Sequence, residues 1–128
     1  STLMRSSAAS DVYKRQRKYD SKKIKEQAEM SILKELASIQ EEKGDAQKEL
    51  EYIEQALTLV KESRTMRGLA ELHFKKAGLL KELMQRNKDM QQEYQKQCQV
   101  ELTMAYYTAL VMNNVELVQK IKTTGDRV

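Results

Sequence analysis

The sequence predicts an all-α protein, with antiparallel helical hairpins stacked as an α-solenoid of about five helices. The first observation is composition: the 128 residues include no proline, four glycines and 33% charged side chains. The second is that aromatic residues make up only 5% of the chain, which is too few for a typical sheet. The third is that apolar residues recur at helical spacing in segments separated by short polar breaks.

The first two predicted helices span residues 21–43 and 46–62. Gly44 suits the left-handed conformation that ends a helix, and Asp45 suits the cap of the next one. Asp20 or Ser21 is the expected cap of the first helix. The expected inward side chains are Ile24, Ala28, Ile32, Leu33, Leu36 and Ile39, followed by Leu50, Ile53, Ala56, Leu57 and Val60.

Three further helices are predicted over residues 66–86, 89–112 and 115–122. Ser63 or Thr65 is the expected cap of the third helix, Asn87 or Asp89 caps the fourth, and the pair Asn113–Asn114 separates the last two. The expected inward side chains are Leu69, Leu72, Ala77, Leu80, Leu83 and Met84, then Met90, Tyr94, Cys98, Leu102, Ala105, Ala109 and Met112, then Val115, Val118 and Ile121.

The fourth helix carries a second apolar stripe, formed by Val100, Met104, Tyr107 and Val111. With both stripes, residues 100–112 are apolar nearly all round, so we expect them to be covered on two sides. One interpretation is an interior helix covered by the third and fifth helices. The other is a surface for a partner subunit or peptide, to which Tyr106 and Tyr107 are suited because each is apolar with a polar tip.

A weak internal repeat accompanies these helices. The stretch "ILKEL" (32–36) recurs as "LLKEL" (79–83), and "EQALTLV" (54–60) is echoed by "YYTALVM" (106–112). Each copy reads as a helix, a turn and a second helix in which a small alanine lies next to leucine. A duplicated helical hairpin at this spacing indicates an α-solenoid, although leucine- and lysine-rich helices also produce such matches by coincidence.

Residues 1–16 are expected to be foreign to the fold. Written as codons, Ser6 to Gln16 resemble the adapter of transposase-based sequencing libraries, so we predict an untrimmed, disordered, adapter-derived tail on a metagenomic fragment. The native polypeptide then begins near Arg17, with an N-terminal part missing, and residues 17–122 form the helical-repeat domain. Removing residues 1–16 leaves 20 basic and 18 acidic residues, a net charge of +2 in place of +4, which gives no support for nucleic-acid binding. Residues 123–128 are expected to be a frayed tail.

No catalytic, metal or cofactor site is predicted. The single cysteine, Cys98, lies on an inward stripe and is expected to be a buried, inert thiol. The single histidine, His73, is expected at a helix surface or boundary, and the sequence offers no partner that would make it a base or a ligand. No run of about 18 apolar residues exists, so we expect no membrane span.

Three stretches carry a resemblance to a known family: "RGLAELHFKKAGLL" (67–80), "ELTMAYYTALVMNN" (101–114) and "VELVQKI" (115–121). They resemble the tetratricopeptide-like C-terminal domains of Firmicute transcriptional regulators that begin with a helix-turn-helix of the phage-repressor type. The resemblance covers residues 67–121, whereas residues 21–63 fit only as a generic repeat. The chain departs from the family in its repeat length of about 47–53 residues, where a standard tetratricopeptide repeat has about 34.

The resemblance implies a cytoplasmic, non-enzymatic sensor and dimerisation domain that binds a peptide or protein and forms a homodimer. It also implies that the first helix of each hairpin lines the concave face, where His73 and Lys76 become candidate partner contacts beside Tyr106 and Tyr107. This fragment itself is not expected to contact nucleic acid or membrane. The alternative is a stand-alone helical-repeat scaffold or adaptor for protein–protein interaction, and a helical enzyme domain is disfavoured because a second polar cluster is lacking.

Overall fold

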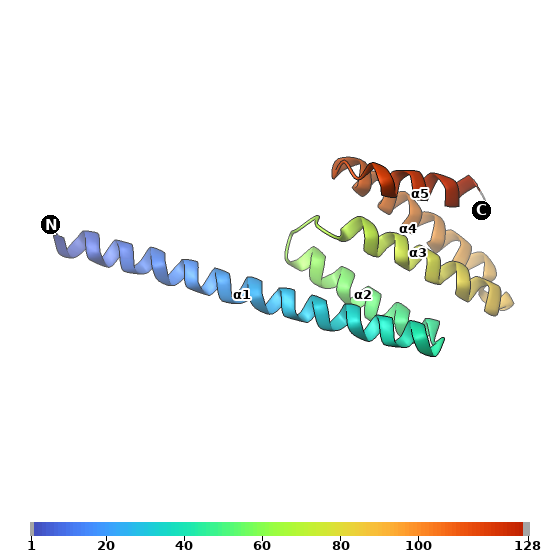
Figure 1. Cartoon of the computed structure of the whole chain (residues 1–128), viewed down its shortest axis with the longest axis horizontal. Coiled ribbons are helices and arrows are strands. Elements are labelled where there is room, and N and C mark those ends of the chain that lie inside the picture. The colour runs from blue at the N-terminus through green and yellow to red at the C-terminus, as the bar shows by residue number, and fades with distance from the viewer. Residues whose placement is uncertain (1, 127–128) are drawn as a thin grey trace. The chain divides into compact units, whose positions relative to one another are not determined.

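The structure is a computed structural model that describes the backbone of residues 2–126 and the side chains of residues 10–125. Within that range the chain contains five α-helices, one short 3-10 helix and no strand, which confirms the all-α prediction. The elements, shown in Figure 1, are α1 (Thr2–Lys43), α2 (Ala46–Glu62), α3 (Leu69–Arg86), η1 (Lys88–Met90), α4 (Gln91–Val111) and α5 (Val115–Asp126).

The chain divides into two units, residues 1–32 and 33–128. In the first unit the side chains of residues 10–32 are exposed, apart from the half-buried Glu26 and Met30. The helix runs through residues 2–16, for which the sequence predicts a disordered tail, and through residues 17–20, where the predicted helix had not yet begun. No proline or glycine occurs before Gly44, so no residue in this stretch breaks a helix. The adapter origin of residues 1–16 stays a prediction.

The end of α1, within the second unit, packs through a different face from the one the sequence predicts. Ala37 is buried, and Leu33, Leu36 and Gln40 are half-buried. The isoleucines of the predicted stripe are exposed: Ile24, Ile32 and Ile39. Leu33, Leu36, Ala37 and Gln40 follow an i, i+3, i+4, i+7 pattern, and that stripe faces the rest of the unit while the isoleucines lie to one side of it.

The turn between α1 and α2 has the chemistry that the sequence predicts. Gly44 adopts φ +76°, a left-handed conformation that costs glycine little because it has no Cβ. The Asp45 carboxylate accepts a hydrogen bond from the backbone N–H of Lys48 at 3.1 Å and so caps α2. All five predicted inward residues of α2 are buried: Leu50, Ile53, Ala56, Leu57 and Val60.

The third helix begins three residues later than predicted, at Leu69. Gly68, at φ +79°, occupies the N-cap position, and the Thr65 hydroxyl accepts the N–H of Arg67 within the preceding turn, so Thr65 does not cap α3. The buried side chains on α3 include the predicted Leu72, Ala77, Leu80 and Leu83, and also Ala70, His73 and Leu79. This broad buried surface makes α3, rather than α4, the most enclosed helix.

The break between α4 and α5 is made by the predicted asparagine pair. Asn113 takes a left-handed φ of +55°, which asparagine tolerates better than most residues. The Asn114 side-chain oxygen then accepts the N–H of Leu117 at 3.2 Å and caps α5. The helix continues to Asp126, so residues 123–126 are helical where fraying was expected, and residues 127–128 lie outside the described part of the chain.

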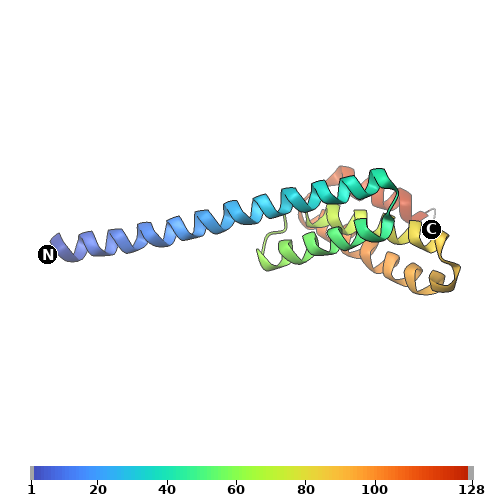
Figure 2. The same ribbon diagram turned by 90° about the horizontal axis from the view of Figure 1, so that it is seen from below.

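Helices α2 to α5 pack in sequence order. The most extensive contact is between α3 and α4, followed by α2 with α3 and α4 with α5 (Figure 2). Each of these helices therefore rests mainly on its neighbours in the chain, and α3 is covered from both sides. The core that results is centred on Ile53 of α2 and on Leu80 and His73 of α3, the largest side chains that are fully buried.

Candidate protein-binding face and polar network

The main candidate site is a stripe of apolar side chains on the outward side of α4. We call it the α4 outer face and define it as Val100, Met104, Tyr107 and Val111, with exposed fractions of 58%, 44%, 62% and 70%. On the opposite side of the same helix, Cys98, Leu102, Ala105 and Ala109 are buried. The neighbouring helices α3 and α5 thus cover one of the two predicted stripes and leave the other in solvent.

This arrangement corrects the expectation that residues 100–112 are covered on two sides. The predicted inward residues Met90, Met112 and Val115 are exposed as well. The physical reason is that α5 is short and its buried side chains, Leu117, Val118 and Ile121, pack on the side of α4 that α3 already occupies. Exposed apolar surface gathered in one place is typical of a binding surface rather than of ordinary solvent-facing helix.

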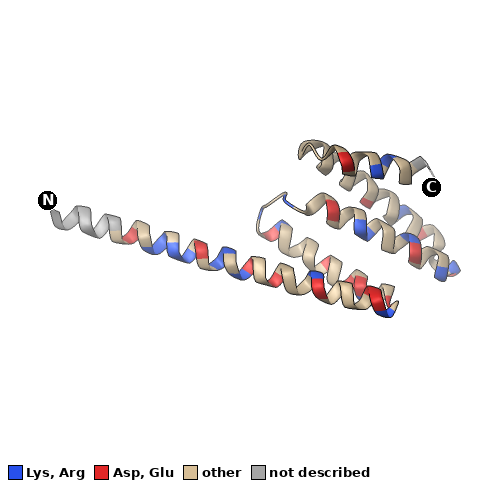
Figure 3. Cartoon of the chain, viewed as in Figure 1, with Lys and Arg blue, Asp and Glu red and all other residues tan. Residues whose placement is uncertain are grey.

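The surface around the α4 outer face is nearly free of charge. Residues 102–112 contain no charged side chain, whereas charges of both signs are interspersed along α1 to α3 (Figure 3). Lys96 lies one turn before Val100, where it lines an open depression with Gln99, Val100, Thr103 and Met104. At the other end the exposed Val115 and Glu116 begin α5. The face is therefore an uncharged strip with a cation at one end and a carboxylate near the other.

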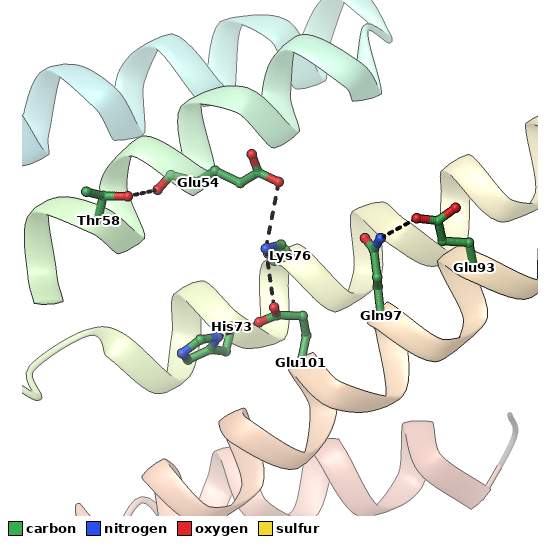
Figure 4. A network of polar contacts seen from close by, with 7 residues as sticks. All are labelled: Glu54, Thr58, His73, Lys76, Glu93, Gln97 and Glu101. Carbon is green, nitrogen blue, oxygen red and sulfur yellow. Dashed lines mark hydrogen bonds and ion pairs between the residues drawn. The ribbon is translucent and has the colours of Figure 1, made fainter. Parts of the chain in front are cut away.

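A polar network on the inner side of α4 joins three helices. We define it as Glu54 of α2, His73 and Lys76 of α3, and Glu101 of α4 (Figure 4). Glu101 binds two partners, with Oε2 at 2.5 Å from His73 Nδ1 and Oε1 at 3.3 Å from Lys76 Nζ. Lys76 Nζ also lies 3.7 Å from Glu54 Oε1, which connects the network to α2.

The network is largely enclosed by protein. His73 is 2% exposed, and the side chains of Lys76 and Glu101 are 19% and 13% exposed. Burial raises the pKa of Glu101, but the hydrogen bond from His73 and the charge of Lys76 outweigh burial, so the pKa lies below its ordinary value. Glu101 is therefore ionised at neutral pH, and His73 Nδ1–H donates to it. The Nε2 atom of His73 is buried without a hydrogen-bond partner among the described residues.

Comparison with protein-family models, curated proteins and solved structures gives no match.

The four residues predicted to contact a partner do not form one site. His73 is buried, so the prediction of a surface or boundary histidine is wrong, and it has no surface to offer a partner. Lys76 is engaged in two ion pairs. Tyr107 alone is widely exposed, and the half-buried Tyr106 packs edge-on against it with ring centroids 5.4 Å apart. The candidate surface therefore moves from α3 to the outer side of α4.

Glu101 is the residue that sequence reasoning missed. It is the only charged residue between Val100 and Met112, at the start of the most apolar stretch of the chain. A lone carboxylate in such a stretch needs a cationic or hydrogen-bonding partner when the helix packs, because an unpaired buried charge is costly. That signal points to the histidine and lysine of the preceding helix.

Cys98 is buried as predicted, and its Sγ lies 3.4 Å from the carbonyl oxygen of Ala77. Burial raises the pKa of its thiol, since the opposing charge of Lys81 has a smaller effect. Among the residues that the structure describes, no three His, Cys, Asp or Glu side chains are grouped to hold a metal ion. A search of the same residues finds no helix with the length and apolar character to cross a membrane.

Proposed function

We propose that this chain is a helical protein-interaction domain that binds a protein or peptide through the α4 outer face. The observation that carries the proposal is the exposure of four apolar side chains on one uncharged strip of a helix that is well packed on its other side. Removing apolar surface from water is favourable by about 25 cal/mol per Å². A partner that covers this strip would gain that free energy without having to desolvate a charged group.

An amphipathic helix is the partner shape that the strip fits best. Helical interfaces are built from apolar anchors at i, i+3, i+4 and i+7, and the α4 outer face offers anchors with that spacing. Tyr107 and Met104 lie at its centre, and both residue types are enriched at protein interfaces. The polar network supports this assignment indirectly, because it fixes α4 against α3 and so holds the strip rigid.

The finer proposal is that the domain is the sensor and dimerisation part of a cytoplasmic Firmicute transcription regulator with a tetratricopeptide-like solenoid fold. It rests on the resemblance of residues 67–121, and the packing of each helix on its sequence neighbours supports it. Sequencing the source gene upstream of the Arg17 codon tests it. A helix-turn-helix domain there would support a regulator, and further helical hairpins without one would instead favour the stand-alone scaffold.

Selection of peptides tests the binding function directly. A displayed library of amphipathic helical peptides, randomised at i, i+3, i+4 and i+7, would be selected against the full chain at a concentration where it is monomeric. We expect selected peptides to lose at least about tenfold in affinity for Val111→Lys, because a charge would then be buried beneath the peptide.

The matched control is Ile24→Lys, which places the same charge at a similarly exposed apolar position on α1. Peptide binding should be unchanged in that variant. Peptides that bind both variants as well as the unmodified chain would show that the α4 outer face is not the binding surface, and the proposal would fail.

A further inference from the structure

The spacing within the α4 outer face is that of a two-helix seam. Val100, Met104, Tyr107 and Val111 are separated by four, three and four residues. This is the alternation of a and d positions in a heptad, the pattern by which one helix packs along another through knobs and holes. The seam is not used within the chain, since all four side chains are exposed.

The seam is also symmetric. Spacings of four, three and four residues read the same from either end, so two copies of α4 placed antiparallel match position for position. Val100 of one copy then lies opposite Val111 of the other, and Met104 lies opposite Tyr107. An isologous contact about a twofold axis requires this kind of self-complementarity. A partner of unrelated sequence would not require it.

On this basis we infer that the occupant of the α4 outer face is a second copy of this chain, packed with its α4 antiparallel to the first. The inference rests on the proposed function and deepens it by naming the partner. It makes the α4 outer face the centre of a twofold dimer, with two valine–valine pairs flanking two methionine–tyrosine pairs.

The charges at the ends of the seam favour the antiparallel orientation. In a parallel pair the two Lys96 side chains would lie beside each other and repel. In the antiparallel pair Lys96 instead lies near residues 115–116 of the second copy, where Glu116 is exposed. Glu101, the one carboxylate next to the seam, is already paired with His73 and Lys76, so it brings no free negative charge to the contact.

Sedimentation equilibrium of the full chain over a range of concentrations tests the inference. We expect a monomer–dimer equilibrium whose Kd rises at least about tenfold in Val100→Lys and in Val111→Glu, because each homodimer would bury two unpaired charges. Ile24→Lys is the control and should leave the Kd unchanged. Circular dichroism of each variant should match the unmodified chain, since the substituted side chains are exposed.

Mixing the variants tests the orientation. Equimolar Val100→Lys and Val111→Glu should form a heterodimer, because an antiparallel seam places the new lysine opposite the new glutamate and keeps one valine pair intact. Equimolar Val100→Lys and Val100→Glu should remain monomeric. Rescue by the second mixture and not by the first would overturn the antiparallel assignment.

Two other outcomes separate this inference from the proposed function. A chain that stays monomeric at all concentrations, yet binds selected peptides in a manner that Val111→Lys abolishes, would overturn the second copy as the occupant and leave the binding function standing. A dimer that persists unchanged in both seam variants would place the contact elsewhere and overturn the inference.

Discussion

His73 of α3 and Glu101 of α4 lie 28 residues apart in the sequence, and their Nδ1 and Oε2 atoms are 2.5 Å apart in the structure. The pair is formed at the most extensive helix–helix contact of the chain. Lys76 adds a second cation to the same carboxylate at 3.3 Å. One glutamate therefore connects two groups of α3 to the helix that carries the proposed binding face.

Replacing Glu101 by glutamine should destabilise the fold. Glu101→Gln keeps the size of the side chain but removes the charge that pairs with His73 and Lys76, so we expect the free energy of unfolding to fall by about 1–3 kcal/mol. Urea denaturation followed by circular dichroism measures it. Glu93→Gln, at an exposed position on the same helix, is the control and should change stability by less than about 0.5 kcal/mol. Equal effects of the two variants would rule out a stabilising pair.

The contribution of Glu101 should depend on pH in the acid range. Its pKa in the folded chain is lowered, so the stabilisation is fully present above the pKa of the unfolded chain and is lost as the pH falls through the folded value. The difference in stability between the unmodified chain and Glu101→Gln should hold above the ordinary glutamate pKa of about 4.3 and shrink below it. Urea denaturation at a series of pH values tests this, and a difference that grows on acidification would contradict it.

Glu49 of α2 should behave in the opposite way. The residue is buried, and its carboxylate lies 3.9 Å from Lys75 Nζ. Burial raises its pKa, as do Glu41 and Glu82, and the opposing effect of Lys75 is not sufficient to reverse the shift. A raised pKa in the folded chain means that stability is highest below the unfolded value and declines as the pH rises through the folded one.

We therefore expect Glu49→Gln to stabilise the chain at neutral pH by on the order of 1 kcal/mol, since it removes a poorly compensated buried charge. The gain should disappear in acid, where the glutamate is already protonated. Glu51→Gln, at an exposed position on the same helix, should have little effect at either pH. Destabilisation by Glu49→Gln at neutral pH would instead indicate that its ion pair with Lys75 dominates.

The features that the sequence predicts correctly are local ones. Gly44 and Asp45, like Asn113 and Asn114, determine where helices end and begin through their own backbone and side-chain chemistry. The apolar stripe of α2 is equally clear because the helix has one apolar face and is covered on it. Such signals depend on a few neighbouring residues and so can be read without knowing the tertiary packing.

The features that the sequence misses depend on which helices lie side by side. His73 was expected at the surface because no partner was visible in the sequence, and its partner Glu101 comes from the next helix. The two copies of the Leu-Lys-Glu-Leu stretch show the same limit. Leu80 and Leu83 are buried between two helices, whereas Leu33 and Leu36 are only half-buried. Identical local patterns thus reach different burial, and the open side of α4 arises in the same way.

The small side chains of α4 should be sensitive to enlargement. Ala109 has no exposed surface where α4 packs on its neighbours, so Ala109→Leu should overpack the core and lower the free energy of unfolding by about 1–3 kcal/mol. Thermal unfolding measures the effect. Ala28→Leu, the same substitution at an exposed position on α1, is the control and should leave the melting temperature nearly unchanged.

Two glycines should respond to alanine with opposite signs. At Gly44 a Cβ would meet no other atom, but the backbone has φ +76°, which alanine adopts at a cost of about 1 kcal/mol, so Gly44→Ala should destabilise the chain. Gly78 lies inside α3, where a Cβ again has open space and alanine favours the helix by about 0.5–1 kcal/mol, so Gly78→Ala should stabilise it. Each serves as the control for the other in urea denaturation. A stabilising effect of Gly44→Ala would mean that the turn before Asp45 does not need its left-handed residue, and the capped boundary between α1 and α2 would have to form in another way.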